Sequence, residues 1–278
     1  MGDELELRVL GPIEVRHDGS PVHLRGEKPR ELLALLAIRP NRPIPAEQLV
    51  EELWQGNPPP SAATALRVHI GRIRGVLELD RSASAPSTRL PAGPHGYVLR
   101  VEPDELDAQR FERLVVLARE AVAAGDPVCA VPQLTQALDL WRGPALADIR
   151  DIAAAGAEIA RLDDLRAVAI EELADARLAL GEHTLAVDLV SAALDQFPLR
   201  ERLTASLMLG LYRGGRQAEA LRAYAQLARR LDEDLGVAPS PDLRRLEEDV
   251  LLQRSSLDYT PGRTTSVPIT QVLSLIHI

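Results

Sequence analysis

The sequence predicts a mainly α-helical protein in which a short α+β segment precedes a long all-α region. Apolar and polar residues alternate as in β-strands only near residues 5–25 and 89–101, and elsewhere the apolar residues recur at helical spacing. Hydrophobic residues make up 46% of the 278 residues but aromatic residues only 3%, so aliphatic side chains and alanine must build the core. Part of the helical region also repeats with a period of 34 residues.

The first sixty residues predict short strands followed by two helices. The strongest local signal is Asp18-Gly19 between two short alternating runs, which is typical of a β-hairpin turn. The apolar spacing then changes to that of a buried helix, and a second helix follows with proline at its start and acidic residues in its first turn. The predicted elements are strands at 5–11 and within 13–25, and helices at 27–39 and 45–56.

The charge of the chain is unevenly distributed. The formal net charge is −9, from 32 basic and 41 acidic residues. Residues 61–101 nevertheless hold six arginines against two acids, a net charge of +4, whereas the residues after 101 hold 19 basic and 29 acidic residues, a net charge of −10. Because a local basic face can supply the phosphate contacts, an acidic body does not exclude DNA binding.

Residues 61–80 predict an amphipathic helix with two different faces, and Ser61 is expected to cap it. The buried face is predicted from spacings of four, three and four residues between Leu66, Ile70, Ile73 and Leu77. The outward face and its flanks carry small, apolar and basic residues: Thr64, Arg67, Val68, His69, Gly71, Arg72, Arg74 and Gly75.

This outward face suits a helix that reads a DNA groove. Its small residues allow close approach to DNA, Arg72 can reach a guanine edge, and Val68 can touch a thymine methyl group. Arg67, His69 and Arg74 can grip phosphates and set the register. The alternative interpretation is an ordinary surface helix with scattered arginines, which this segment alone leaves open.

The segment at 89–101 favours DNA binding over that alternative. It predicts two short strands around Gly93-Pro94-His95-Gly96, and strands, three helices and a hairpin form the order of a winged helix-turn-helix. The hairpin, or wing, would carry Arg89 and His95 toward a minor groove or phosphates.

The segments ALRVHIGRIRGVL and LPAGPHGYVLRV resemble the recognition helix and wing of OmpR/PhoB-type winged-helix domains. The resemblance implies that Arg72 contacts bases and that His69 and Arg74 contact phosphates. Thr64 stands where that family often has a phosphate-binding arginine, so a weaker contact is expected there. The loop QGNPPP before the helix corresponds to a loop that in the family approaches RNA polymerase.

A 34-residue period in the second half predicts stacked helix pairs. Gly181 and Gly215 are separated by this distance, and so are Ala186 and Ala220. Thirty-four residues is the length of a tetratricopeptide (TPR) repeat, in which neighbouring helix pairs bury one another's apolar stripes. A looser copy begins near Gly125. Helix hairpins that pack without true repeat identity remain the alternative.

The helical half also resembles a known domain. The segments LDLWRGPALAD, RERLTASLMLGLYRGGRQAEALRAY and LDEDLGVAPSPDLRRLEEDVL are similar to the bacterial transcriptional activation domain, which follows a winged helix in the antibiotic regulatory protein (SARP) family of actinomycetes. The resemblance covers residues 5–254. It implies a cytoplasmic activator of a secondary-metabolite gene cluster that binds direct repeats in double-stranded DNA near the −35 element, as a homodimer on DNA, and contacts RNA polymerase.

We therefore expect three parts: a winged-helix DNA-binding domain at 1–101, an all-α TPR-like activation domain at 102–254, and a disordered tail or truncated linker at 255–278. No enzyme, cofactor or metal site is expected. The histidines lack metal-ligand spacing, and the one lysine, Lys28, stands between Glu27 and Pro29, which excludes a P-loop. Cys129 is expected to be buried, and the adjacent pairs Glu171-Glu172 and Asp163-Asp164 are expected to be solvated.

Two functions remain open on the sequence alone. The first is a DNA-binding activator, carried by the basic window, the helix at 61–80 and its wing. The second is a helical-repeat scaffold that uses the winged helix for protein contacts, which the acidic body favours. Salt-dependent, sequence-specific binding to DNA would distinguish the first from the second.

Overall fold

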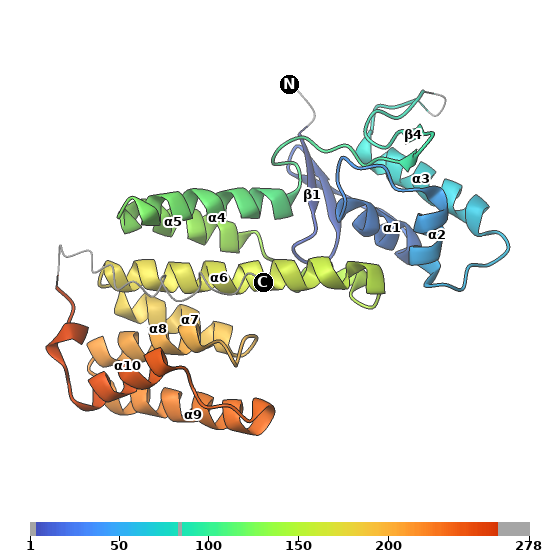
Figure 1. Ribbon diagram of the computed structural model, residues 1–278. Coiled ribbons are helices and arrows are strands. Elements are labelled where there is room, and N and C mark those ends of the chain that lie inside the picture. Colours follow the sequence, from blue (N-terminus) through green and yellow to red (C-terminus); the bar gives the residue numbers. More distant parts are fainter. Residues whose placement is uncertain (1–3, 83–84, 261–278) are drawn as a thin grey trace. The chain divides into compact units, whose positions relative to one another are not determined.

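The computed structural model describes residues 4–82 and 85–260 and divides into two compact units (Figure 1). The first unit runs to Val116 and resumes at Thr135–Arg166, and the second holds Leu117–Leu134 and resumes at Ala167. The mainly helical fold class with an N-terminal sheet is confirmed. Of the predicted tail at 255–278, residues 255–260 are described and residues 261–278 lie outside the described residues.

A three-stranded antiparallel sheet opens the first unit, with β1 (Leu5–Arg8), β2 (Glu14–His17) and β3 (Ser20–Val22) in that order. The predicted hairpin at Asp18-Gly19 is confirmed, because both residues have positive φ, 46° and 74°, as a tight hairpin turn requires. The sheet buries alternate side chains, among them Leu5, Leu7 and Val15.

Three helices and a short hairpin follow the sheet, in the predicted order. They are α1 (Glu27–Ala37), α2 (Ala46–Trp54), α3 (Ala62–Leu77), β4 (Ala92–Gly93) and β5 (Gly96–Tyr97). Gly96 has φ of +114°, and a Cβ built there would lie 1.9 Å from the carbonyl oxygen of Ile44. Glycine is therefore required where the wing crosses the segment before α2. Two backbone hydrogen bonds of 2.9 Å between Tyr97 and Ile44 join the wing to that segment.

The first unit continues into the helical half of the sequence. It includes the first part of α4 (Asp107–Ala123), the end of α5 (Pro127–Asp139), the turns η1 (Ala147–Ile149) and η2 (Ala153–Ala155), and the start of α6 (Gly156–Ala179). Asp107 joins these parts, because its buried carboxylate accepts backbone hydrogen bonds from Val9 at 2.8 Å and Leu10 at 3.1 Å. Backbone bonds from Arg142 to Leu10 and from Leu146 to Val9 add to this contact.

The second unit is built from helices, with α7 (His183–Leu194), α8 (Glu201–Arg213), α9 (Gln217–Leu235), α10 (Pro241–Leu251) and the turn η3 (Ser255–Leu257) beside the remainders of α4, α5 and α6. The glycines of the 34-residue period lie in matching turns. Gly125, Gly181 and Gly215 have φ of 75°, 80° and 74°, and the residue after each donates its backbone N–H to the carbonyl five residues before it. This is the Schellman arrangement of a helix C-terminus.

The alanine near the start of each second helix is fully buried, at Ala130, Ala186 and Ala220. A small side chain there lets the two helices of a pair approach closely. The shared turn geometry and the shared buried alanine explain physically why the sequence repeats at this distance.

Three local expectations were wrong. The side chain of Ser61 makes no capping hydrogen bond, because its backbone, at φ −89° and ψ 6°, lacks the extended conformation that a capping side chain needs. Cys129 is exposed, because it lies in the first turn of α5 and its thiol faces Asp126, which raises the pKa of the thiol. Glu171 is buried and paired with Arg200 and Arg202, so it is not a solvated charge.

Candidate nucleic-acid interface

The two faces of α3 are as the periodicity predicts. Leu66, Ile70, Ile73 and Leu77 are each at most 2% exposed. The opposite face carries exposed Thr64, Arg67, Val68, Gly71 and Arg72, and the side chain of Val68 is 50% exposed. Single exposed hydrophobic residues are normal on a protein surface, so it is the combination of exposed basic, small and apolar residues on one helix face that marks this surface as a candidate interface.

The two arginines of this face carry no ion pair with any residue of the described chain. Arg67 donates only a long hydrogen bond of 3.3 Å to the Thr64 hydroxyl. A Cβ added at Gly26 would lie 3.7 Å from a guanidinium nitrogen of Arg72, so Gly26 leaves room beside that guanidinium. Both side chains are therefore free to bind phosphate or base edges.

His69 lies between α3 and α2 at the margin of this face. Its ring stacks on Trp54 with centroids 6.4 Å apart. Partial burial lowers the pKa of His69, and the positive charges of Arg72 and Lys28 lower it further. A neutral imidazole can donate one hydrogen bond to a phosphate but contributes no charge. His69 is thus placed to set register more than to supply electrostatic attraction.

Arg74 connects α3 to the wing. Its Nε donates a 2.9 Å hydrogen bond to the carbonyl oxygen of Leu90, and the side chain is half-buried. Figure 1 shows the wing strand β4 beside α3, in agreement with this bond. One donor of the guanidinium is therefore structural, and the others remain for a phosphate.

The structure places the two predicted wing residues differently. His95 is exposed at the tip between β4 and β5. Arg89 lies at the base, where its guanidinium makes two hydrogen bonds of 2.8 Å to the carboxylate of Glu105. The structure therefore places His95 at the outer end of the wing, whereas the guanidinium of Arg89 is bound to Glu105 of the same unit.

Residues that the sequence reasoning did not single out hold the interface together. Glu78, at the end of α3, accepts hydrogen bonds from the Thr88 amide, the Thr88 hydroxyl and the Arg89 amide at 2.7, 2.7 and 3.1 Å. Burial raises the pKa of Glu78, but hydrogen bonds from Ser87, Thr88 and Arg89 outweigh it and lower the pKa to about 2. No local pattern signals these contacts, which join residues ten and eleven positions apart.

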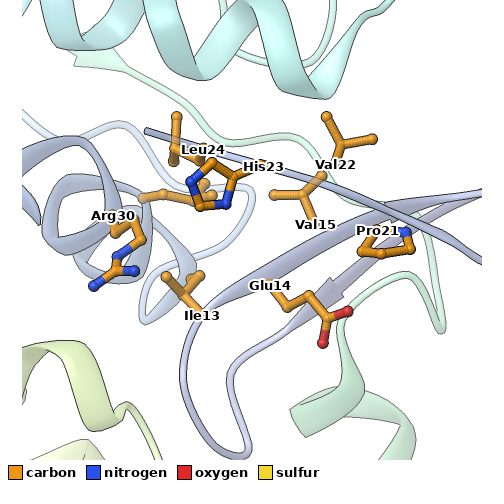
Figure 2. Close-up of a pocket in the computed structure, with 9 residues that line it drawn as sticks. Ile13, Glu14, Val15, Pro21, Val22, His23, Leu24 and Arg30 are labelled. Carbon is orange, nitrogen blue, oxygen red and sulfur yellow. The ribbon is translucent and has the colours of Figure 1, made fainter. Parts of the chain in front are cut away.

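A pocket of about 360 Å³ lies beside β2, β3 and α1 (Figure 2). Its lining includes the apolar residues Val15, Val22 and Leu33. Figure 2 shows the side chains of Arg30 and Glu14 extending away from each other. Because Arg30 already pairs with Asp148, Nε to Oδ1 3.1 Å, we assign the pocket no part in binding DNA.

No group of three or more His, Cys, Asp or Glu in residues 4–82 and 85–260 is arranged to hold a metal ion. Within the same ranges, no helix has the length and apolar character needed to cross a membrane.

The strands, three helices, wing and outward basic face define a winged-helix DNA-binding domain joined to an all-α activator domain. The family comparison agrees: residues 19–90 match the family "Transcriptional regulatory protein, C terminal", and residues 106–251 match "Bacterial transcriptional activator domain". The chain is a DNA-binding transcriptional regulator.

Similar proteins identify the family more closely. The chain is 37% identical over 252 residues to the transcriptional regulator RedD of Streptomyces coelicolor, covering 91% of this chain and 72% of RedD. It is 35% identical over 257 residues to the regulatory protein DnrI of Streptomyces peucetius, covering 91% of this chain and 94% of DnrI. The structure of Mycobacterium tuberculosis EmbR in complex with a low-affinity phosphopeptide matches with a TM-score of 0.83 at 33% identity, covering 91% of this chain and 66% of that chain. The chain belongs to the antibiotic regulatory protein (SARP) family.

Proposed function

We propose that this regulator activates transcription by inserting α3 into the major groove of a specific double-stranded DNA site. One observation carries the proposal: α3 hides its apolar face and presents Arg67 and Arg72, both without ion partners in the described chain, beside exposed Gly71. A helix of this kind can approach base edges closely, because glycine adds no side chain between the helix and the groove.

The exposed residues have separate roles in this proposal. Arg72 donates to the O6 and N7 atoms of a guanine, and Val68 contacts a thymine methyl group. Arg67, Arg74 and His69 contact phosphates, with Thr64 as a weaker contact, and these bonds set the register of α3 on the duplex. His95 reaches the adjacent phosphates or minor groove from the wing tip. We leave Arg89 out of the direct contacts, because Glu105 occupies its guanidinium.

The finer parts of the function rest on the family and its activator domain. We propose that two copies bind direct repeats near a promoter −35 element as a homodimer on DNA, and that the helical region contacts RNA polymerase. We also propose that the protein acts in the cytoplasm and that it activates a secondary-metabolite gene cluster. Membership of the SARP family and the match to a bacterial transcriptional activator domain support these proposals.

The first test is selection of bound duplexes from a random-sequence DNA library with the purified chain, followed by mobility shifts on the selected duplex. Arg72→Ala should weaken binding and relax the preference at one base pair. Arg229→Ala removes an exposed arginine of α9 as a matched control and should leave binding unchanged. Equal binding by all three proteins would contradict the placement of α3 in the groove. A footprint that covers a single half-site at saturation would contradict binding to direct repeats.

The second candidate is a helical-repeat scaffold whose winged helix binds protein. The net charge of −10 after residue 101 favours it, since an acidic body repels DNA. It predicts that any DNA binding is weak and shows no preference for sequence. An affinity for the selected duplex at least a hundredfold, or about 3 kcal/mol, above that for an unrelated duplex at the same salt concentration would exclude it.

A further inference from the structure

The base of the wing is held from two sides by carboxylates. On one side lies Glu78, the residue that follows α3, and on the other lies Glu105, just before α4. Between them lie Thr88 and Arg89, which begin the wing, and backbone hydrogen bonds join Arg89 to Arg100 and Pro91 to Val98 across its base. The wing is therefore attached through a few named polar contacts in addition to the two-residue strands β4 and β5.

The Glu78 contact fixes the wing to the recognition helix. Its Oε1 accepts three hydrogen bonds from Thr88 and Arg89, and its other oxygen lies 3.4 Å from Nε of Arg81. Hydrogen bonds to an ionised carboxylate are about twice as strong as neutral ones. Arg74 adds a second link from α3 to this segment through the Leu90 carbonyl at 2.9 Å.

The Glu105 contact fixes the same segment to the rest of the unit. The Arg89 guanidinium binds both oxygens of Glu105 in the paired geometry that makes arginine–carboxylate bonds specific, and both side chains are less than a quarter exposed. The backbone carbonyl of Glu105 accepts a 2.7 Å hydrogen bond from Leu7 of β1. The Glu78, Arg89 and Glu105 contacts thus join α3, the wing and the N-terminal sheet, and we call these three residues the wing clamp.

We propose that the wing clamp sets the position of the wing relative to α3, and that Arg89 acts in it as a positioning residue that does not touch DNA. This inference rests on the proposed function, because the position of the wing matters for a duplex bound by α3. According to this inference, Glu78 and Glu105 promote DNA binding although both are acidic residues beside a DNA-binding surface.

Charge reversal separates positioning from direct contact. Arg89→Glu and Glu105→Arg should each lower affinity for the selected duplex about tenfold, because each substitution removes both hydrogen bonds between these side chains and releases the base of the wing. The double variant restores an ion pair of opposite polarity and should recover affinity to within about threefold of the unmodified chain. If Arg89 contacts phosphate, glutamate at this position repels DNA in the double variant as well. Affinity in the double variant as low as in Arg89→Glu would overturn the proposal.

A second pair of variants gives opposite signs and does not depend on rescue. Asp80→Asn removes an exposed negative charge close to Glu78 and should leave affinity unchanged or slightly higher, because less negative charge faces the phosphates. Glu78→Gln removes the same charge but should weaken binding severalfold. Equal or tighter binding by Glu78→Gln would overturn the role of the clamp.

Hydrogen exchange distinguishes failure of this inference from failure of the proposed function. In the absence of DNA, Glu78→Gln should speed exchange of the Thr88 and Arg89 amides, whereas Asp80→Asn should not. Faster exchange without any specific DNA binding by the unmodified chain would refute the proposed function, and with it the clamp's role in DNA recognition. Specific DNA binding with unchanged exchange in Glu78→Gln would refute the wing clamp alone.

Discussion

The charged residues of α3 and those around α8 have the same chemistry and opposite surroundings. On α3, Arg67 and Arg72 are exposed and carry no ion partner in the described chain. In the second unit, Arg202 binds Asp175 at 2.7 Å and lies 3.6 Å from Glu171, whose other oxygen is 3.4 Å from Arg200. Ser206 completes this cluster by donating a 2.9 Å hydrogen bond to Asp175.

The contrast separates charges that serve binding from charges that serve folding. Removal of an unpaired, exposed arginine should cost the free protein little stability. Removal of a paired arginine from a half-buried cluster leaves the charge of its acidic partners uncompensated and should lower stability. Burial already raises the pKa of Glu171 despite the attraction of Arg200 and Arg202. Substitutions in the two regions should therefore affect different measurements.

The largest expected effect is on stability, at the α8 cluster. Arg202→Met keeps much of the side-chain volume but removes the positive charge between Glu171 and Asp175, so the free energy of unfolding should fall by about 3 kcal/mol. Urea denaturation followed by circular dichroism measures this change. Arg230→Met, at an exposed position of α9, is the matched control and should change stability by less than about 0.5 kcal/mol. A loss no larger than in the control would show that the cluster is not structural.

The next effect is on DNA affinity, at α3. Arg72→Ala should lower affinity for the selected duplex by about ten- to a hundredfold, equivalent to roughly 1–3 kcal/mol, because a base contact is lost. Its free energy of unfolding should stay within about 0.5 kcal/mol of the unmodified chain, because the guanidinium has no ion partner among the described residues that would be left unpaired. Fluorescence anisotropy and urea denaturation measure the two quantities. A stability loss comparable to that of Arg202→Met would remove the distinction between the two regions.

Asp107 sharpens the comparison, because it is a buried acid held by backbone amides. Burial raises its pKa to about 6, although the hydrogen bonds from Val9 and Leu10 lower it. The pKa in an unfolded chain is about 3.9, so between pH of about 4 and 6 the folded state holds more protons than the unfolded state. The free energy of unfolding should therefore fall as pH rises through this window, by at most about 3 kcal/mol.

The pH effect is measured by urea denaturation at several pH values. Asp107→Asn cannot ionise and should lose this part of the pH dependence, whereas Asp80→Asn should keep it. A slope that is the same in Asp107→Asn and the unmodified chain would show that Asp107 does not take up a proton on folding.

The smallest effect is expected at Arg67, a phosphate contact in the proposal. Arg67→Ala should weaken binding to all duplexes by a similar factor, without a change in base preference. The slope of log affinity against log salt concentration should become shallower by about one. A change confined to one base pair would instead assign Arg67 to base recognition.

Much of the fold and part of the site could be predicted from local sequence. The Asp18-Gly19 turn, the two faces of α3 and the glycine turns at Gly181 and Gly215 all follow from short-range patterns, and the structure contains each of them. Exposure of Val68 and Arg72 could be predicted for the same reason, since helical spacing determines which side chains share a face.

The polar contacts could not be predicted in this way. Local pattern placed Arg89 on the wing but could not show that Glu105 would bind it. It also predicted a solvated Glu171, although Arg200, 29 residues away, lies beside it. Asp107 meets Val9 across 98 residues. Local pattern reports the direction of a side chain from its own helix or strand, but the partner depends on which distant element packs opposite.

The amino-acid sequence by itself determined the order of helices and strands, the hidden and outward faces of α3, and the period of the helix pairs. Only the tertiary structure decided which charges are available to a ligand and which are bound within the protein. The physical reason is that periodicity arises from bonded geometry along one element, whereas an ion pair or a buried carboxylate requires two elements to be brought together by packing.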